Sequence, residues 1–600
     1  MGIIDQFKRF LSRDKNIPLL LAGVTVLVYF LCLPNQMFWD DDDFILKNIY
    51  IQDWQYWQKF FTSNVISGAH FISNYWRPLL QTVFAAEWHL WANWVYGWHA
   101  VSIACHAAAA ILLFKLLNAL LKDRTLSILA ALLWVVHPVH TEAVVYPNSL
   151  GDSLATIFIL GGTYAYTLFR ASGQHAAKCR FWWIALLMYL MALLSKETGI
   201  LLVAFIAITD YFFLTPDEKF FSKARRILIA IWPLILIAVI YLVLRGTVLN
   251  FNNSFNFYNE ASPFAAQPIM RLWTFFRVMA LYSGFIFFPY ELRVERIIDP
   301  PTSFFVPDVM WGGLLCASLI GLSVYYWKKR PAIAFGAVWF FIAILPTSNL
   351  LVLINALIYE HFLYGALIGI LIIALTFTLD AVKSEKGRRT TIIWIAGMII
   401  LLGIRSAWRC TDWRTAMGFY EQLIPYVPKS YRVANNLGMI YAENNLTDKA
   451  IGTYKKAMAI DPSNAVAYHN IANIYRDQGN KELARINYEK AIALQPDFFF
   501  SYKSLAQIYL DRNELTKARM LLERYFGLTD EKIYTLNLLT EIAYREGAYG
   551  EARRYLLVLL QLQPGNPEAI AALKKLEAVQ LNKTRTSAAG NTPMITGVNP

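Results

Sequence analysis

Four consecutive carboxylates, Asp40, Asp41, Asp42 and Asp43, follow the first apolar segment of the chain. A carboxylate can accept the proton of a hydroxyl group and so act as a general base, and several carboxylates together can bind a divalent cation. The same run would also suit a solvated loop with no chemical role. The choice among these interpretations depends on what else lies beside the apolar segments of the chain.

Further ionisable residues stand at the ends of other apolar segments. They are Arg77 in YWRPLL, His137, His140 and Glu142 in HPVHTEAV, Asp152 at the start of the next segment, Lys196 and Glu197 in LSKETG, and Glu360 and His361 in IYEHFLYG. Ionisable groups at membrane depth are costly, so they usually pair, face a cavity and mark a functional site. Because so many ionisable residues share this placement, we interpret the acidic run as part of a functional site instead of a solvated loop.

The two histidines of HPVHTEAV invite comparison with metal sites. A proline follows His137, and Glu142 comes after His140, whereas zinc-binding helices carry HExxH with both histidines on one helical face. The spacing therefore favours hydrogen bonding within the site, or contact with a phosphate, over metal ligation. His137, Asp42 and Asp43 are the candidate ligands if the site holds a metal ion.

Membrane helices must position these motifs. Apolar residues make up 57% of the 600 residues and charged residues only 16%, more apolar surface than a water-soluble protein can bury. Segments that can cross a bilayer lie near 17–35, 98–121, 125–145, 151–170, 181–197, 199–214, 227–246, 308–327, 332–346, 353–378 and 391–408. The net charge of +13 comes from Lys and Arg in the short loops, which excludes a basic face for nucleic acid.

The basic loops predict an orientation. With the N-terminus inside, all of them lie inside only if the apolar stretch 271–290 makes no net crossing, so we expect this stretch to be re-entrant or to lie along the outer surface. About 11 spans then leave the C-terminus outside, whereas about 12 would reverse its side. All the motifs above then face the extracytoplasmic side of a bacterial inner membrane or an equivalent membrane.

The C-terminal region repeats with a period of 34 residues. Five alanines keep this spacing: Ala416, Ala450, Ala484, Ala518 and Ala552. Small residues where helices cross, aromatic fillers and helix-ending prolines at this period predict tetratricopeptide repeats. The clear units are 431–464 and 465–498, and the weaker units are 499–532 and 533–566. We expect an all-α protein with a membrane region (1–409), a repeat domain (410–575) and a disordered tail (576–600).

Taken in order, these motifs resemble a known family. Asp40-Asp41 with Ile45 and Asn48, then YWRPL, HPVHTEAV with Asp152, SKETG, and LPTSN with YEHFLYG look like the transmembrane and tetratricopeptide-repeat O-mannosyltransferases and their prokaryotic relatives. These are polytopic glycosyltransferases of the GT-C class. The resemblance covers about residues 20–570 and includes the repeats.

The resemblance implies an inverting transfer of a sugar from a polyprenyl-phosphate carrier to a serine or threonine of a protein acceptor, on the lumenal or periplasmic face. It also implies that Asp40 or Asp41 is the catalytic base and that Glu142 belongs to a second acidic motif. Where relatives often carry a basic residue and a proline near the LY element, this chain has EHFLYGA. His361 is therefore the candidate cation for the phosphate.

A lipid phosphate can leave without being protonated, so the site must supply cations and hydrogen-bond donors for its developing charge. Four residues are candidates for this role: Arg77, Lys196, His361 and His140. Three carboxylates are candidates to support them: Asp152, Glu197 and Glu360. The sequence leaves open whether the acidic loops also share a divalent cation.

The repeats predict a protein partner, because tetratricopeptide arrays present a groove to polypeptides. On the outer face they would recruit the acceptor or a partner, and a self-contained assembly module is the alternative. Two other functions stay open for the whole chain. One is a ligase or polymerase of lipid-linked oligosaccharides, although such ligases tend to use arginine and histidine in one large periplasmic loop. The other is a non-catalytic membrane scaffold.

Overall fold

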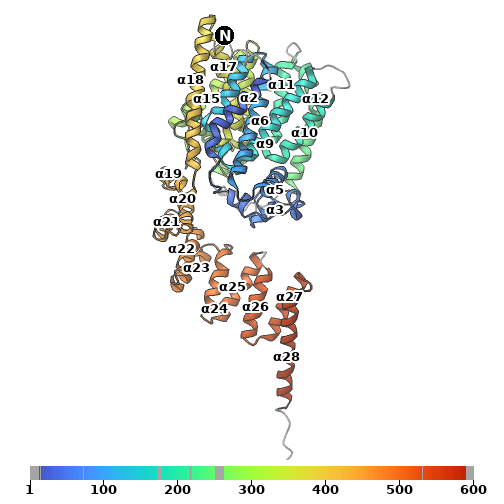
Figure 1. The fold of residues 1–600 in the computed structure, drawn as a ribbon, viewed down its shortest axis with the longest axis vertical. Helices are drawn as coiled ribbons and strands as arrows, with labels where there is room; N and C mark the ends of the chain where they lie inside the picture. Colours follow the sequence, from blue (N-terminus) through green and yellow to red (C-terminus); the bar gives the residue numbers. More distant parts are fainter. Residues whose placement is uncertain are drawn as a thin grey trace, which may run out of the picture. The chain divides into compact units, whose positions relative to one another are not determined.

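The computed structural model describes residues 13, 15–71, 73–171, 179–214, 219–249, 263–529 and 532–589. Every regular element in these ranges is a helix, which confirms the all-α class. The chain divides into two compact units, 1–419 and 420–600, which Figure 1 draws from blue to yellow and from orange to red. The boundary lies at residue 419, whereas the sequence predicts it at 409.

The first unit is a bundle of helices. Its longer helices are α2 (Asn16–Tyr29), α5 (Pro78–Trp91), α6 (Val95–Leu121), α7 (Arg124–Val136), α9 (Leu150–Ala171), α10 (Cys179–Ser195), α11 (Leu202–Thr209), α12 (Phe220–Gly246), α14 (Pro268–Phe287), α15 (Pro307–Tyr326), α16 (Pro331–Ile344), α17 (Leu363–Ala381) and α18 (Glu385–Arg409). Helix α19 (Ala416–Leu423) follows at the boundary between the units.

Many of these helices can cross a membrane. Within the described ranges, seven stretches are long and apolar enough: Val95–Leu121, Glu197–Leu214, Phe220–Gly246, Pro268–Phe287, Pro307–Tyr326, Glu360–Ala381 and Glu385–Trp413. Helix α7 and the bent continuation after it, Pro138–Val145, make an eighth if they count as one span. Three shorter apolar helices are Asn16–Cys32, Cys179–Ser195 and Pro331–Thr347. The multi-pass membrane class is thereby confirmed.

Helix α14 (Pro268–Phe287) covers most of the stretch 271–290 that the sequence leaves ambiguous. It is continuous for 20 residues and is among the seven stretches that can cross a membrane, so it does not turn back on itself as a re-entrant segment would. An orientation along the outer surface stays a prediction. By contrast, α9, which the sequence predicts to cross, is not among the seven although it has 22 residues.

Helices α16 and α17 approach closely at a pair of glycines. A Cβ atom on Gly336 would lie 2.6 Å from the carbonyl oxygen of Gly369, and one on Gly369 would lie 2.2 Å from the carbonyl oxygen of Gly336. Small residues at such a crossing let two backbones pack without intervening side chains, as membrane helices often do. This contact fixes α17 inside the bundle, and α17 begins directly after Glu360 and His361.

The second unit consists of paired helices. The pairs are α20 (Tyr431–Glu443) with α21 (Thr447–Ile460), α22 (Ala465–Asp477) with α23 (Lys481–Leu494), α24 (Phe500–Asp511) with α25 (Leu515–Leu528), and α26 (Lys532–Arg545) with α27 (Tyr549–Leu562). The alanines at positions 450, 484, 518 and 552 are completely buried. The structure therefore confirms the 34-residue period, including both weaker units.

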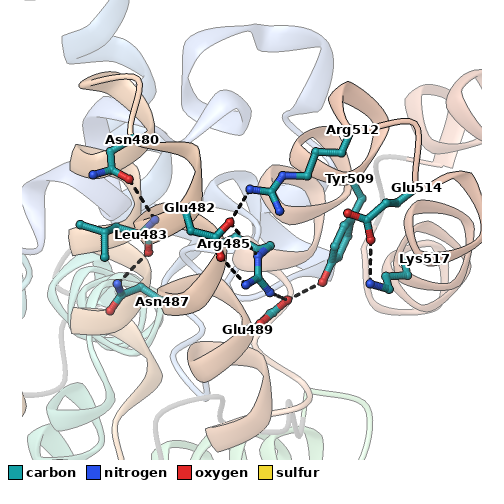
Figure 2. A network of polar contacts seen from close by, with 10 residues as sticks. All are labelled: Asn480, Glu482, Leu483, Arg485, Asn487, Glu489, Tyr509, Arg512, Glu514 and Lys517. Atoms are coloured by element: carbon teal, nitrogen blue, oxygen red, sulfur yellow. Dashed lines mark hydrogen bonds and ion pairs between the residues drawn. The ribbon is translucent and has the colours of Figure 1, made fainter.

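Polar contacts join neighbouring repeats on the surface of this unit (Figure 2). Glu482 of α23 accepts hydrogen bonds from Arg485 of the same helix and from Arg512, which follows α24. These bonds lower the pKa of Glu482 to about 2. Because Glu482 is exposed, we expect the contacts to add little stability and mainly to set how adjacent repeats face each other.

A last helix, α28 (Pro567–Ala589), follows the repeats. It continues 14 residues into the segment 576–600, for which the sequence predicts disorder. Its N-terminal part packs against α27, with Ala569 and Leu576 buried in the core of the repeats. Packing on the last repeat holds the first part of this helix, which then continues to Ala589, and residues 590–600 lie outside the described ranges.

The buried alanines predict a clear effect on stability. Replacing Ala484 with Leu forces three further carbon atoms into a close helix crossing, so we expect the free energy of unfolding of the repeat unit to fall by about 1–3 kcal/mol. Ala493→Leu, on the exposed face of the same helix, is the matched control and should change it little. The free energy of unfolding of each variant is measured by denaturant titration of the full-length protein. Protease cleavage within the repeats reports the fraction of unfolded repeat unit at each denaturant concentration. Equal destabilisation by Ala484→Leu and Ala493→Leu would contradict the idea that the helix crossing at Ala484 requires a small residue.

Candidate functional site

The acidic run follows α2 and leads into a short helix, η2 (Asp42–Leu46), and the first two aspartates of the run have different surroundings. Asp41 is buried, and its carboxylate accepts hydrogen bonds from the backbone N–H groups of Asn148 (2.9 Å) and Phe38 (3.3 Å). Burial raises the pKa of Asp41 well above its usual value. Asp40 is exposed, and its backbone N–H donates to the hydroxyl of Tyr146 (2.9 Å). Asp41 thus ties two loops together, whereas Asp40 is accessible.

The other two aspartates are partly buried. Asp42 forms an ion pair with Lys47, with 3.2 Å between Oδ2 and Nζ. Burial raises the pKa of Asp43 to about 6, although the charge of Lys47 opposes this shift. In the part of the chain that the structure describes, no group of three or more His, Cys, Asp or Glu side chains is arranged to hold a metal ion.

Two ion pairs gather four of the residues that the sequence singles out. Arg77, directly before Pro78 at the start of α5, donates to Glu197 through Nη2 (2.9 Å) and Nε (3.1 Å). Lys196 lies 2.6 Å from Asp152, measured from Nζ to Oδ1. Because Lys196 and Glu197 are adjacent in the chain, the two pairs lie side by side. An arginine that binds a carboxylate through two nitrogens is held in a defined orientation.

A tight turn at LSKETG places this lysine and glutamate. The short helix η8 (Glu197–Leu201) follows α10 directly and folds back against it. A Cβ atom on Gly199 would lie 2.3 Å from both the carbonyl carbon and the carbonyl oxygen of Ala192 in α10. Only glycine fits such a close approach of two backbones. The glycine of this motif is therefore a requirement for the positions of Lys196 and Glu197.

The motif YEHFLYG meets HPVHTEAV at a buried carboxylate. Glu142 accepts hydrogen bonds through Oε2 from the backbone N–H groups of Glu360 (3.0 Å) and His361 (3.2 Å). Its Oε1 lies 2.8 Å from Nδ1 of His361. Glu360 pairs with Arg409 at 2.6 Å, and both are buried. Glu142 thereby fixes the position of the His361 ring, and Arg409 neutralises Glu360.

A cavity opens beside Lys196 and His361. Its polar lining includes Asp152, Lys196, Thr198 and His361. The rest of its lining is largely apolar and comes from α9, η8, α11, α16 and α17: Ile159, Leu160, Leu201, Phe205, Trp339 and Ile368. We call this space the donor cavity. A polar end next to an apolar interior suits a molecule that has a charged group on a hydrocarbon chain.

Tyr75 links the donor cavity to the acidic run. Burial raises the pKa of Tyr75, and the charges of Arg77, Glu197 and Asp40 also act on its hydroxyl. The Arg77 guanidinium lies over the Tyr75 ring, 4.6 Å from its centroid. Tyr359, which stacks on the His361 ring at 5.2 Å, affects the same hydroxyl. Charged and polar groups from the acidic run, from YWRPLL and from YEHFLYG therefore all lie close enough to Tyr75 to act on its hydroxyl.

The histidines of HPVHTEAV lie elsewhere. His140, in the short helix η5 (Pro138–His140), is completely buried, and its ring packs against Trp134 (4.8 Å) and Tyr364 (4.9 Å). His137 is held by the backbone, with Nε2 3.0 Å from the carbonyl oxygen of Ile286. Neither histidine lines the donor cavity, so we do not include His140 among the phosphate contacts.

Sequence reasoning missed three residues of this site: Tyr75, Tyr146 and Arg409. Tyr75 stands two residues before Arg77, so its place in the same motif was an available signal. Arg409 ends α18, and an arginine at the end of an apolar helix resembles an ordinary membrane flank until its partner is known. Nothing in the sequence around Tyr146 indicates that its hydroxyl binds the backbone of Asp40.

Comparison with known proteins supports both parts of the chain. Family models of the tetratricopeptide repeat match residues 430–497 and 469–528. A protein O-mannosyl-transferase of Caenorhabditis elegans is 24% identical over 446 residues, which cover 72% of this chain and 61% of the relative. Protein O-mannosyl-transferase TMTC4 of Homo sapiens is 24% identical over 487 residues, which cover 72% of this chain and 64% of the relative.

Among solved structures, YrrB, a tetratricopeptide-repeat protein with an unusual peptide-binding site, aligns with a TM-score of 0.25 and 20% identity, covering 27% of this chain and 84% of YrrB. The chain spans less than two thirds of the length of either transferase relative. Those alignments cover too much of this chain to be confined to the repeats, so they include much of residues 1–419. The chain is thus similar to proteins named protein O-mannosyl-transferases over most of its length, and its C-terminal part matches the tetratricopeptide repeat.

Proposed function

We propose that this protein is a membrane glycosyltransferase. It transfers a sugar from a polyprenyl-phosphate carrier to a serine or threonine of a protein acceptor, on the extracytoplasmic side and with inversion at the sugar carbon. The observation that carries the proposal is the donor cavity, where Lys196 and His361 stand at the polar end of an apolar lining. The printed names of the relatives, protein O-mannosyl-transferases, support the same class of reaction.

The donor cavity suits the carrier in two ways. Lys196 has three N–H donors, and one of them is directed to Asp152, which leaves others for phosphate oxygens. Glu142 holds Nδ1 of His361 at 2.8 Å, so the other ring nitrogen, Nε2, is the one that would contact the phosphate. The apolar side chains beyond them would contact the first isoprene units. Mannose is the sugar that the names of the relatives suggest.

Asp40 is the base in this mechanism. It is exposed, whereas Asp41 is buried and its two oxygens accept backbone hydrogen bonds. The acceptor hydroxyl gives its proton to Asp40 while its oxygen forms a bond to the anomeric carbon. The bond from that carbon to the phosphate oxygen breaks, and the electron pair leaves with the lipid phosphate. Attack from the face opposite the phosphate inverts the anomeric carbon.

Cations on the leaving side stabilise the charge that the phosphate gains. Lys196 and His361 line the cavity, and Arg77 lies beside them through its pair with Glu197. Charged donors that are held in place before the reaction stabilise a transition state without rearranging. Glu142 acts through His361 and is a positioning residue in this scheme. The repeats would bring the protein acceptor, since such arrays bind polypeptides.

The function as a whole is tested by mass spectrometry of surface proteins from a strain that lacks the gene. We expect particular serine or threonine peptides to lose a hexose and to regain it when the gene is restored. Loss of a whole oligosaccharide would favour the lipid-linked oligosaccharide ligase instead. Unchanged glycosylation together with loss of an envelope complex would favour the scaffold.

Asp40→Asn tests the base. Because an amide cannot accept the proton, we expect sugar transfer in membranes to fall by about 100-fold or more. Asp41→Asn should reduce transfer less, because its amide can still accept one of the two backbone bonds. Asp42→Asn, which removes an exposed ion pair with Lys47, is the matched control and should stay near the wild-type rate. Full activity of Asp40→Asn would exclude this assignment, whatever the activity of Asp41→Asn.

Gly199→Ala tests how the cations are placed. The added Cβ would clash with the backbone at Ala192, so the turn must shift and carry Lys196 away from the phosphate. We expect the KM for the lipid donor to rise about tenfold, since small displacements of a positioning group have large effects. Gly161→Ala in α9 meets only ordinary contacts, at 3.5 Å or more, and serves as the control. An unchanged KM in a folded Gly199→Ala protein would contradict this role of the turn.

A further inference from the structure

The end of the first unit packs against the stretch of chain that carries the acidic run. This end, residues 409–419, includes the short helix η12 (Cys410–Trp413) and the first residues of α19, and we call it the junction segment. Hydrogen bonds join it to two residues that precede Asp40. They run from the Asn35 side chain to the carbonyl oxygen of Cys410 (2.9 Å), from the Gln36 backbone N–H to the carbonyl oxygen of Arg414 (3.2 Å), and from the Ala416 backbone N–H to the Gln36 side chain (3.1 Å).

Aromatic rings fill the contact between these two stretches. The ring of Trp413 stacks on that of Tyr146, with 5.4 Å between the centroids, and also contacts Phe38 (5.8 Å) and Phe419 (4.7 Å). All four side chains are buried. Because Trp413 contacts each of the other three rings, removing its side chain would leave a cavity between segments that are far apart in the sequence.

The backbone directly before Asp40 requires such support. Trp39 has a φ angle of 67°, a left-handed conformation that a bulky residue adopts only where its surroundings impose it. The ring of Trp39 packs edge-on against Phe419, with 5.6 Å between the centroids. The junction segment therefore contacts a strained position next to Asp40.

Tyr146 extends this contact to Asp40 itself. Its hydroxyl accepts a hydrogen bond from the backbone N–H of Asp40, and its ring stacks on Trp413. The junction segment is anchored in turn at its first residue, where the buried Arg409 pairs with Glu360 beside His361. One short segment thus contacts both the acidic run and the residue next to the proposed phosphate ligand.

We propose that Trp413 is a positioning residue for sugar transfer, which holds Asp40 where it can accept the proton of the acceptor hydroxyl. This inference rests on the proposed function, in which Asp40 is the base. A base must lie within hydrogen-bond reach of the proton that it removes, so a displacement of about 1 Å lowers the rate strongly. Among the described residues, Trp413 is not part of the lining of the donor cavity. Its loss therefore affects the chemical step and not the binding of the lipid donor.

The first measurement is sugar transfer by full-length Trp413→Ala. We expect kcat to fall about tenfold while the KM for the lipid donor changes by less than about twofold. Trp413→Phe keeps an aromatic ring in the cluster and should regain most of the lost kcat. Trp408→Ala is the matched control, because Trp408 ends near the same place on α18 but is 71% exposed, and it should leave kcat unchanged. A wild-type kcat in Trp413→Ala, or an equal loss in Trp408→Ala, would overturn the proposal.

Hydrogen exchange of the backbone amides, followed by mass spectrometry, is a second measurement that does not depend on the reaction. In Trp413→Ala we expect the amides of residues 36–44 to exchange at least about threefold faster, and those of residues 192–199 to keep the wild-type rate. Equal acceleration in both stretches would indicate a general loss of stability and would overturn the proposal.

The two measurements separate this inference from the proposed function. Full activity of Asp40→Asn would reject Asp40 as the base, whatever the exchange rates show. An inactive Asp40→Asn, together with unchanged kcat and exchange in Trp413→Ala, would reject only the positioning role. If Trp413→Ala does not fold, Phe419→Leu, which removes the ring contact with Trp39 but stays apolar, takes its place. We expect it to lower kcat and to speed exchange at residues 36–44, and no change in either would overturn the proposal.

Discussion

Charge at membrane depth is the constraint on which the first unit depends. Removing an ion from water costs several kcal/mol unless an opposite charge lies close by. Arg409 and Glu360 are both buried and lie 2.6 Å apart, although 49 residues separate them in the chain. Arg77 is held by Glu197 in the same way. Each such pair joins distant segments, so the requirement for neutrality also brings the loops of the site together.

The same requirement gives the two ends of α9 different chemistry. At one end, Asp152 pairs with Lys196 beside a cavity whose interior is apolar. At the other end, the buried Asp210 pairs with Arg170 and Arg226.

Much of the architecture could be predicted from the sequence because its patterns are local. Alanines spaced by 34 residues indicate close helix crossings, and the structure buries Ala450 and Ala484 at these crossings. Several of the ionisable residues at the ends of apolar segments are also neighbours: Arg77 contacts Glu197, Lys196 contacts Asp152, and Glu142 contacts His361. The helical continuation to Ala589 was not predicted, because the helix has little amphipathic pattern of its own and only its first part packs in the core of the repeats.

The sequence by itself determined which kinds of residue had to meet: acidic and basic groups that the membrane would not tolerate alone, and repeats that could only stack on one another. Only the tertiary structure decided the partners. It buries Asp41 under two backbone hydrogen bonds and leaves Asp40 exposed, and it places His140 in an aromatic core instead of the donor cavity. The reason is physical: pattern and composition report the cost of burying a group, whereas a partner depends on distances between segments that are far apart in the chain.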